Sequence, residues 1–145
     1  MNITTICIGK TDEKAIENLL QKYENRLPSH INYQRIEIPD IKNRKNLSEI
    51  QQKQKEAEQI LAKIINTDFV IILDEKGKQP TSKQFADDIQ NYMNQSVKNL
   101  VFVIGGPYGF DESVYNRGNK MVRLFLTEQI YRGFSILQGK PYHHE

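Results

Sequence analysis

The stretch LVFVIGGPYG, residues 100–109, joins a continuous apolar run to a glycine-rich turn. A second unbroken apolar run, FVIIL, covers residues 69–73. Strands that are covered on both faces have such runs, and these strands are typical of parallel sheets. The two runs therefore predict the centre of a mainly parallel sheet, with the Gly-Gly-Pro turn at the end of one central strand.

Shorter β-rich runs and segments of helical period alternate on the N-terminal side of this centre. Residues 3–8 and 31–38 are predicted strands, and Pro39 ends the second, which fits an edge position. Alternation of strands with helices predicts an α/β fold in which helices cover both faces of the sheet. No repeat or linker divides the chain, so residues 1–145 are predicted to form a single domain.

The predicted helices have recognisable starts. Ser48 with Gln51, and Thr81 with Gln84, form capping boxes, and Thr11 or Asp12 could cap the first helix. The first helix carries its apolar residues in one stripe. The second is expected to turn a stripe inward as well. These stripes are Ala15, Ile16, Leu19, Leu20, Tyr23 and Leu27, and then Ile50, Ala57, Ile60, Leu61 and Ile64.

The predicted last helix, residues 121–137, is apolar on two sides. One stripe is Val122, Leu126, Ile130, Phe134 and Leu137, and other apolar residues lie well off it. A second apolar side favours burial against another chain, so we expect a homodimer. Enclosure of this helix within the monomer is the alternative.

Composition limits the class of protein. The single cysteine, Cys7, excludes a disulfide within the monomer and fits a reducing cytoplasm. No segment approaches the ~18 apolar residues of a membrane span, so no membrane partner is expected. The net charge of +2 is too small to indicate nucleic-acid binding by itself. Local basic clusters are Lys42, Arg44 and Lys45, and then Arg123, Arg132, Lys140, His143 and His144.

Two strand ends and the C-terminus are candidate sites. Ligands of open parallel sheets bind beyond the carboxyl ends of the strands, here at residues 73–78 and 105–109. Asp74 and Glu75 could bind a ribose, although acidic residues also end strands without a function. The ending PYHHE, residues 141–145, offers stacking, hydrogen bonding and proton transfer. No nucleophile elbow or metal motif is present, so no metal is expected.

Several motifs together resemble one family. They are Leu73-Asp74 with Gly77-Lys78, the run IGGPYG at 104–109, MVRL at 121–124, EQIYR at 128–132 and the ending PYHHE. In this order they resemble the RlmH family of the SPOUT superfamily, whose members methylate N3 of a pseudouridine in large-subunit ribosomal RNA.

The resemblance implies an α/β fold with a C-terminal trefoil knot, a homodimer and S-adenosylmethionine as cofactor. By position, Leu73, Gly105, Gly106 and Pro107 would bind this cofactor, and Arg132, Tyr142 and His143 would face the RNA as catalytic residues. The proton on N3 must leave during such a reaction. His143 could remove it, or the tail could orient the base while solvent takes the proton; Arg132 could stabilise the developing charge or hold a phosphate.

One departure from the family lies between Arg117 and Met121, where only Gly118, Asn119 and Lys120 remain. Family members have a further strand and a loop that covers the adenine there, and we expect these three residues to be too few for a strand and a covering loop together. The cofactor pocket is then incomplete, or a segment is missing from the printed sequence. Intact flanking motifs favour the second explanation.

Three functions remain open from the sequence. The first is an active methyltransferase on assembled ribosomes. The second is a nonenzymatic ribosome-binding protein that lost its cofactor loop. The third is a flavodoxin-like nucleotide-binding domain, which would have no affinity for RNA.

Overall fold

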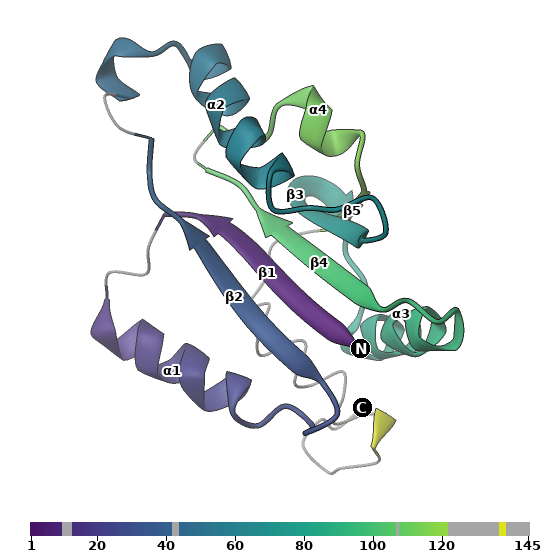
Figure 1. The fold of residues 1–145 in the computed structure, drawn as a ribbon. Coiled ribbons are helices and arrows are strands. Elements are labelled where there is room, and N and C mark those ends of the chain that lie inside the picture. The colour runs from purple at the N-terminus through teal and green to yellow at the C-terminus, as the bar shows by residue number, and fades with distance from the viewer. Residues whose placement is uncertain (10–12, 42–43, 107, 122–136, 139–145) are drawn as a thin grey trace.

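A computed structural model describes residues 1–9, 13–41, 44–106, 108–121 and 137–138. In this part of the chain, five strands form one sheet in the order β2-β1-β4-β3-β5, and every pairing of neighbouring strands is parallel (Figure 1). The strands are β1 (Asn2–Ile8), β2 (Asn32–Ile38), β3 (Phe69–Lys78), β4 (Asn99–Ile104) and β5 (Asn119–Met121). The predicted parallel sheet is confirmed, with β2 at an edge as expected.

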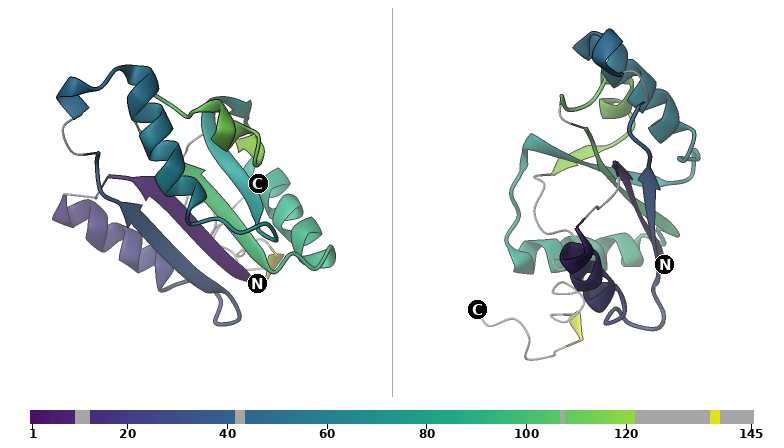
Figure 2. Two further views of the ribbon diagram at one scale, coloured as in Figure 1. Left: turned by 45° about the horizontal axis from the view of Figure 1, so that its top comes forward. Right: turned by 90° about the vertical axis from the view of Figure 1, so that its left-hand side faces the viewer.

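Helices cover both faces of this sheet, which confirms the predicted α/β class. They are α1 (Lys14–Glu24), α2 (Glu49–Leu61), α3 (Ser82–Asn94) and the short α4 (Glu112–Tyr115), with a 3₁₀ turn, η1, at Arg44–Asn46. Figures 1 and 2 show α2 and α4 together on one side and α1 and α3 on the other. Side chains of α2 and α4 share one core cluster, and those of α3 belong to another.

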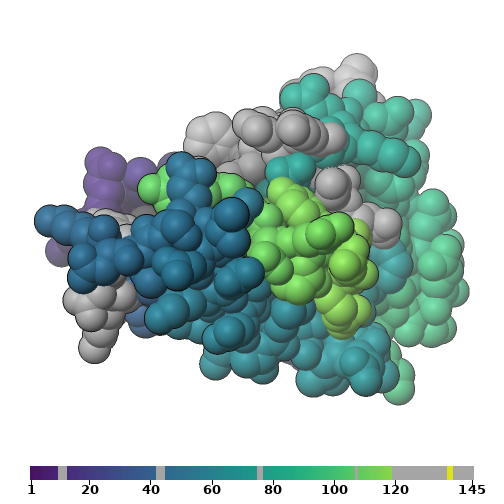
Figure 3. All heavy atoms as spheres, turned by 90° about the horizontal axis from the view of Figure 1, so that it is seen from above, coloured from purple at the N-terminus to yellow at the C-terminus, as the bar shows by residue number. Residues whose placement is uncertain are grey.

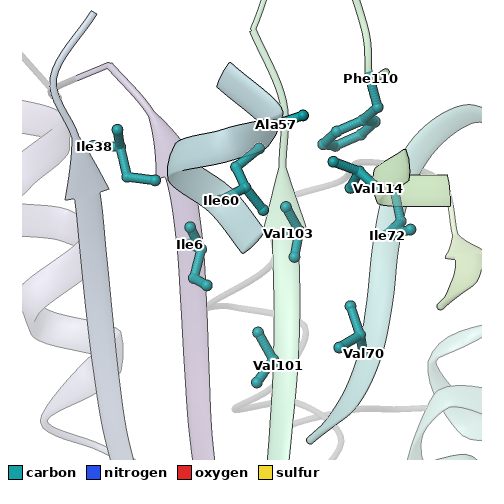
Figure 4. Packing of buried hydrophobic residues seen from close by; sticks show 10 residues of the cluster. All are labelled: Ile6, Ile38, Ala57, Ile60, Val70, Ile72, Val101, Val103, Phe110 and Val114. Carbon is teal, nitrogen blue, oxygen red and sulfur yellow. The ribbon is translucent and has the colours of Figure 1, made fainter. Parts of the chain in front are cut away.

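The core beneath α2 and α4 connects the helices to the strand ends. Figure 4 shows Ala57 and Ile60 of α2 beside Phe110 and Val114, above side chains of the four longer strands. Ile60 and Val114 are almost fully buried. The turn after β4 is therefore fixed to the sheet by apolar burial, which is the main stabilising contribution in a domain of this size.

On the opposite face of the sheet, α3 and α1 are attached by different kinds of contact. Beneath α3, Phe85 packs edge-to-face on Phe102 of β4, with ring centroids 6.1 Å apart. In contrast, α1 has no buried residue, and Ile16 and Leu19 of its predicted stripe are 46% and 49% exposed. Within the described residues, α1 is tied to β2 by ion pairs of Arg35 instead.

The predicted helix starts are confirmed in two cases. Ser48 with Gln51, and Thr81 with Gln84, each form both hydrogen bonds of a capping box. The first helix begins later than predicted, because Glu13 is its N-cap residue and makes no side-chain cap hydrogen bond. The prediction of a cap at Thr11 or Asp12 is therefore wrong.

The chain around β5 differs from the predictions in three ways. The sequence patterns predict no strand between Arg117 and Met121, and the structure forms one at Asn119–Met121 by pairing it with Ile71–Leu73. Met121, predicted to start a helix, lies in this strand. In addition, β3 continues to Lys78, past the expected end at Leu73. Pairing with a neighbouring strand, absent from local patterns, explains these differences.

The rest of the predicted last helix, residues 122–136, lies outside the described residues, so its two-sided burial stays a prediction. Leu137 is described and packs at the margin of the core cluster beneath α3. None of the helices in the described ranges has the length and apolar character that crossing a bilayer requires.

Candidate functional site: the ends of the central strands

The sheet brings two of the predicted cofactor residues to one edge. Leu73 of β3 pairs with Ile104 of β4, and Gly105 follows directly after this pair. Gly106 comes next, while Pro107 lies outside the described residues. The Leu73 side chain is 4% exposed and belongs to the core, so a ligand at this edge would meet mainly the backbone there.

Neighbouring side chains pack closely on Gly105 and Gly106 in the turn after β4. A Cβ atom on Gly105 would lie 2.9 Å from the Phe110 ring, and one on Gly106 would lie 2.5 Å from Oε2 of Glu56. Gly106 also forms a bridge with Gly109, whose amide donates to the Gly106 carbonyl at 3.3 Å. Close packing on the protein side thus fixes the path of the turn.

A hydrogen bond joins the last residue of α4 to the middle of β3. The Tyr115 hydroxyl donates to Oδ1 of Asp74 at 3.1 Å, and the Tyr115 ring packs edge-to-face on Phe110 at 5.5 Å. Asp74 is one of the two acidic residues that could bind a ribose, and its carboxylate is half-buried next to Leu73, whose strand partner Ile104 precedes the glycine turn. A carboxylate in this position can accept hydrogen bonds from the hydroxyls of a nucleoside.

Glu56 is a residue that the sequence reading missed. It projects from the inner face of α2, is 3% exposed and accepts a hydrogen bond from Nε2 of Gln52 at 3.3 Å. Burial raises the pKa of its carboxyl group; the Gln52 hydrogen bond lowers that pKa, and the negative charge of Asp40 raises it further. Ile50, predicted to face inward, is instead 64% exposed. The sequence signal that could have revealed Glu56 is its position one helical turn before Ile60, which places both residues on the same face of α2.

Figure 3 shows the molecule from the side of α2 and α4, whose atoms lie against each other. Glu56 is almost fully buried under this surface, and its carboxyl group lies next to Gly106 there. The glycine turn is therefore supported from within the protein by α2.

The other predicted site residues are not brought together by the described part of the chain. Arg132, Tyr142 and His143 lie outside it, as do Lys42 of the first basic cluster and all of the second cluster. His30 is exposed. Among the described residues, no group of three or more His, Cys, Asp or Glu side chains is arranged to hold a metal ion.

Comparison with known proteins identifies the family. Residues 1–143 match the family model described as predicted SPOUT methyltransferase. Proteins named ribosomal RNA large subunit methyltransferase H are similar over nearly the whole chain. Those of Christiangramia forsetii and Flavobacterium johnsoniae are both 51% identical, over 99% and 100% of this chain and of their own lengths. The corresponding protein of Bacteroides thetaiotaomicron is 43% identical over the full length of both chains.

These alignments also reveal a difference in length. The alignment with the Flavobacterium johnsoniae protein spans 157 positions, against 145 residues in this chain. At least 12 aligned positions therefore have no residue here. The glycine turn, the adjoining parallel strands and a match over almost the whole chain lead to one conclusion: this chain belongs to the SPOUT methyltransferase family.

Proposed function

We propose that this chain transfers a methyl group from S-adenosylmethionine to N3 of a pseudouridine in large-subunit ribosomal RNA, on assembled ribosomes. The observation that carries the proposal is the close adjacency of Leu73 to the Gly105–Gly106 turn at the end of a parallel sheet. Such strand ends bind nucleotide-like ligands. Ribosomal RNA as the class of substrate is supported by the similar proteins that are named ribosomal RNA large subunit methyltransferase H.

The residues at this edge fit S-adenosylmethionine. Leu73, Gly105 and Gly106 offer backbone groups, Pro107 would stiffen the turn, and Asp74 presents a carboxylate to ribose hydroxyls. When bound, the cofactor supplies a methyl group already activated by its sulfonium. The protein must then hold the acceptor base in line and exclude water, which are tasks of positioning.

The acceptor side of the site is assigned to the C-terminal part of the chain. We propose that Arg132, Tyr142 and His143 contact the RNA, with Tyr142 stacking on a base and Arg132 holding a phosphate or the developing negative charge. His143 is the candidate that accepts the N3 proton; transfer to solvent is the alternative.

The finer architecture is part of the same proposal. It comprises a single domain of residues 1–145 with a C-terminal trefoil knot, acting as a homodimer in the cytoplasm. The two-sided apolar pattern of residues 121–137 supports the dimer. Replacing Ile130 or Tyr131 by aspartate should produce a monomer with little methyl transfer, and full activity in a proven monomer would contradict the dimer requirement.

The decisive experiment is transfer of radiolabelled methyl groups from S-adenosylmethionine to bacterial ribosomes that lack the modification. Incorporation into a pseudouridine of the large-subunit RNA is the expected result. His143→Ala and Arg132→Ala should lower turnover, whereas replacement of the exposed Lys63 by alanine is the matched control. Free large-subunit RNA and ribosomes should be compared in parallel, because only ribosomes are expected to serve as substrate.

The missing aligned positions support a second candidate, a ribosome-binding protein without activity. An intact mass of the natural protein that equals 16.9 kDa would show that the chain lacks those positions. A larger mass would show that the printed sequence omits a segment. Ribosome binding without cofactor binding, at the lower mass, would favour the nonenzymatic protein.

A further inference from the structure

We propose that Glu56 is a positioning residue for the cofactor-binding turn: its buried carboxyl group, held by Gln52, packs on Gly106 and fixes the path of the backbone between β4 and α4. This inference deepens the proposed function and rests on the assignment of the Gly105–Gly106 turn to the cofactor. Glu56 acts through Gly106 and needs no contact with the cofactor itself.

The geometry shows how close this packing is. A Cβ atom built on Gly106 would lie 2.5 Å and 2.8 Å from the two carboxyl oxygens of Glu56. Both distances are well inside van der Waals contact, so the carboxyl group of Glu56 would have to move if position 106 carried a side chain. Both oxygens face the same α-carbon, which places the whole carboxyl group against the turn.

The position of Glu56 on α2 supports a dedicated role. Its neighbours on the buried face are Ala57 and Ile60, which pack into the apolar core, and Gln52, which donates to its carboxyl group at 3.3 Å. Burying a carboxyl group costs free energy that an apolar side chain would not. Glu56 is nevertheless only 3% exposed, and we infer that its contact with Gly106 is the function that offsets this cost.

The neighbouring glycine offers an internal comparison. A Cβ atom on Gly105 would meet the Phe110 ring at 2.9 Å, not Glu56. Gly105→Ala and Gly106→Ala thus disturb the same turn through different partners. Only the effect of Gly106→Ala should depend on the residue at position 56.

The first test needs no cofactor. In Glu56→Ala, hydrogen exchange at the amides of Gly105, Gly106 and Tyr108 should accelerate about tenfold, while exchange in Val101–Val103 stays unchanged. Glu58→Ala, on the exposed face of the same helix, is the matched control and should change neither. Unchanged exchange throughout the turn in Glu56→Ala would overturn the proposal.

The second test is a double-mutant cycle with S-adenosylmethionine, read by calorimetric titration. Glu56→Ala should raise Kd about tenfold, and Gly106→Ala should raise it further. The double variant should bind no more weakly than Gly106→Ala alone, because both changes break one contact. In the double variant of Glu56→Ala and Gly105→Ala, the increase in Kd should instead equal the product of the two separate increases.

Glu56→Gln keeps the shape of the side chain and should restore most of the affinity lost in Glu56→Ala. The packing mechanism would be overturned if Glu56→Gln bound as weakly as Glu56→Ala. It would also be overturned if the effects of Glu56→Ala and Gly106→Ala on Kd were independent of each other. If the unaltered protein fails to bind S-adenosylmethionine, the proposed function fails at its cofactor, whereas the exchange experiment still decides the role of Glu56.

Discussion

The hydroxyl of Tyr115 donates a hydrogen bond to Oδ1 of Asp74 across 3.1 Å, and so connects α4 to the middle of β3. These residues lie far apart in the chain, on either side of the glycine turn. Removal of a half-buried hydrogen bond costs about 1 kcal/mol of folding free energy. Because the Tyr115 ring also packs on Phe110, the hydroxyl and the ring contribute separately.

Tyr115→Phe should therefore lower the free energy of unfolding by about 1 kcal/mol, as measured by urea denaturation. The ring contact with Phe110 remains in this variant, so the core should stay packed. Tyr108→Phe is the matched control, because Tyr108 is 46% exposed and its hydroxyl is not needed for this connection. Equal losses in the two variants would show that the bond to Asp74 contributes nothing specific.

A second prediction concerns the strand that the sequence did not reveal. A Cβ atom on Gly118 would lie 2.2 Å from the carbonyl oxygen of Val70, which is backbone and cannot turn away. Gly118→Ala should thus displace β5 from β3 and cost about 3 kcal/mol, the cost of an overpacked site. Asn116→Ala, in the exposed turn just before it, is the control and should change stability little. Unaltered urea denaturation in Gly118→Ala would contradict the observed pairing.

The centre of the sheet could be predicted from sequence because its signals are local. The apolar runs at 69–73 and 100–104 needed no knowledge of their neighbours, and the capping boxes at Ser48 and Thr81 are formed within one helical turn. The edge that we propose for the cofactor followed from the same reasoning, since the carboxyl ends of parallel strands meet at one edge.

What could not be predicted depends on contacts between distant residues. The fifth strand exists through pairing of Asn119–Met121 with β3, and its own sequence has no strand pattern. Glu56 could not be singled out from the sequence, because its contact with Gly106 comes from the packing of α2 over the turn. Ile50 and Ile16 followed helical periodicity and are nevertheless exposed in the structure.

A third prediction tests how α1 is attached. Arg35 pairs with Glu17 and with Glu24, the latter at 3.2 Å, and Glu37 lies 3.7 Å away. Arg35→Ala leaves these carboxylates facing one another and should cost about 2 kcal/mol at pH 7. Hydrogen exchange should also accelerate in residues 14–24, since none of them is buried.

Arg26→Ala is the control for this helix, because Arg26 is exposed and only lies over the Tyr23 ring at 5.8 Å. Its loss should stay below about 1 kcal/mol. Burial raises the pKa of the Glu24 carboxyl group, so this partner loses its charge as the pH falls to 3, and the cost of Arg35→Ala should shrink there. A cost that is the same at pH 3 and pH 7 would show that packing of the Arg35 side chain, not its charge, holds α1.

The last prediction follows from the burial of Glu56. Burial raises the pKa of its carboxyl group in the folded protein above the ordinary value of 4.5, so the folded state holds this proton more tightly than the unfolded chain. The resulting stabilisation is complete below the unfolded pKa and is lost as the pH rises through the folded pKa. At pH 7 the ionised group therefore destabilises the fold relative to a side chain that stays neutral.

Glu56→Gln has such a side chain, and Gln52 can still donate to its amide oxygen. This variant should be more stable than the unaltered protein at pH 7, and its advantage should disappear near pH 4, as measured by urea denaturation at both values. Glu58→Gln, exposed on the same helix, should change stability equally little at both pH values. If Glu56→Gln destabilised the protein at pH 7, the ionised carboxylate would be stabilising the fold through its partners, and burial would no longer account for its titration.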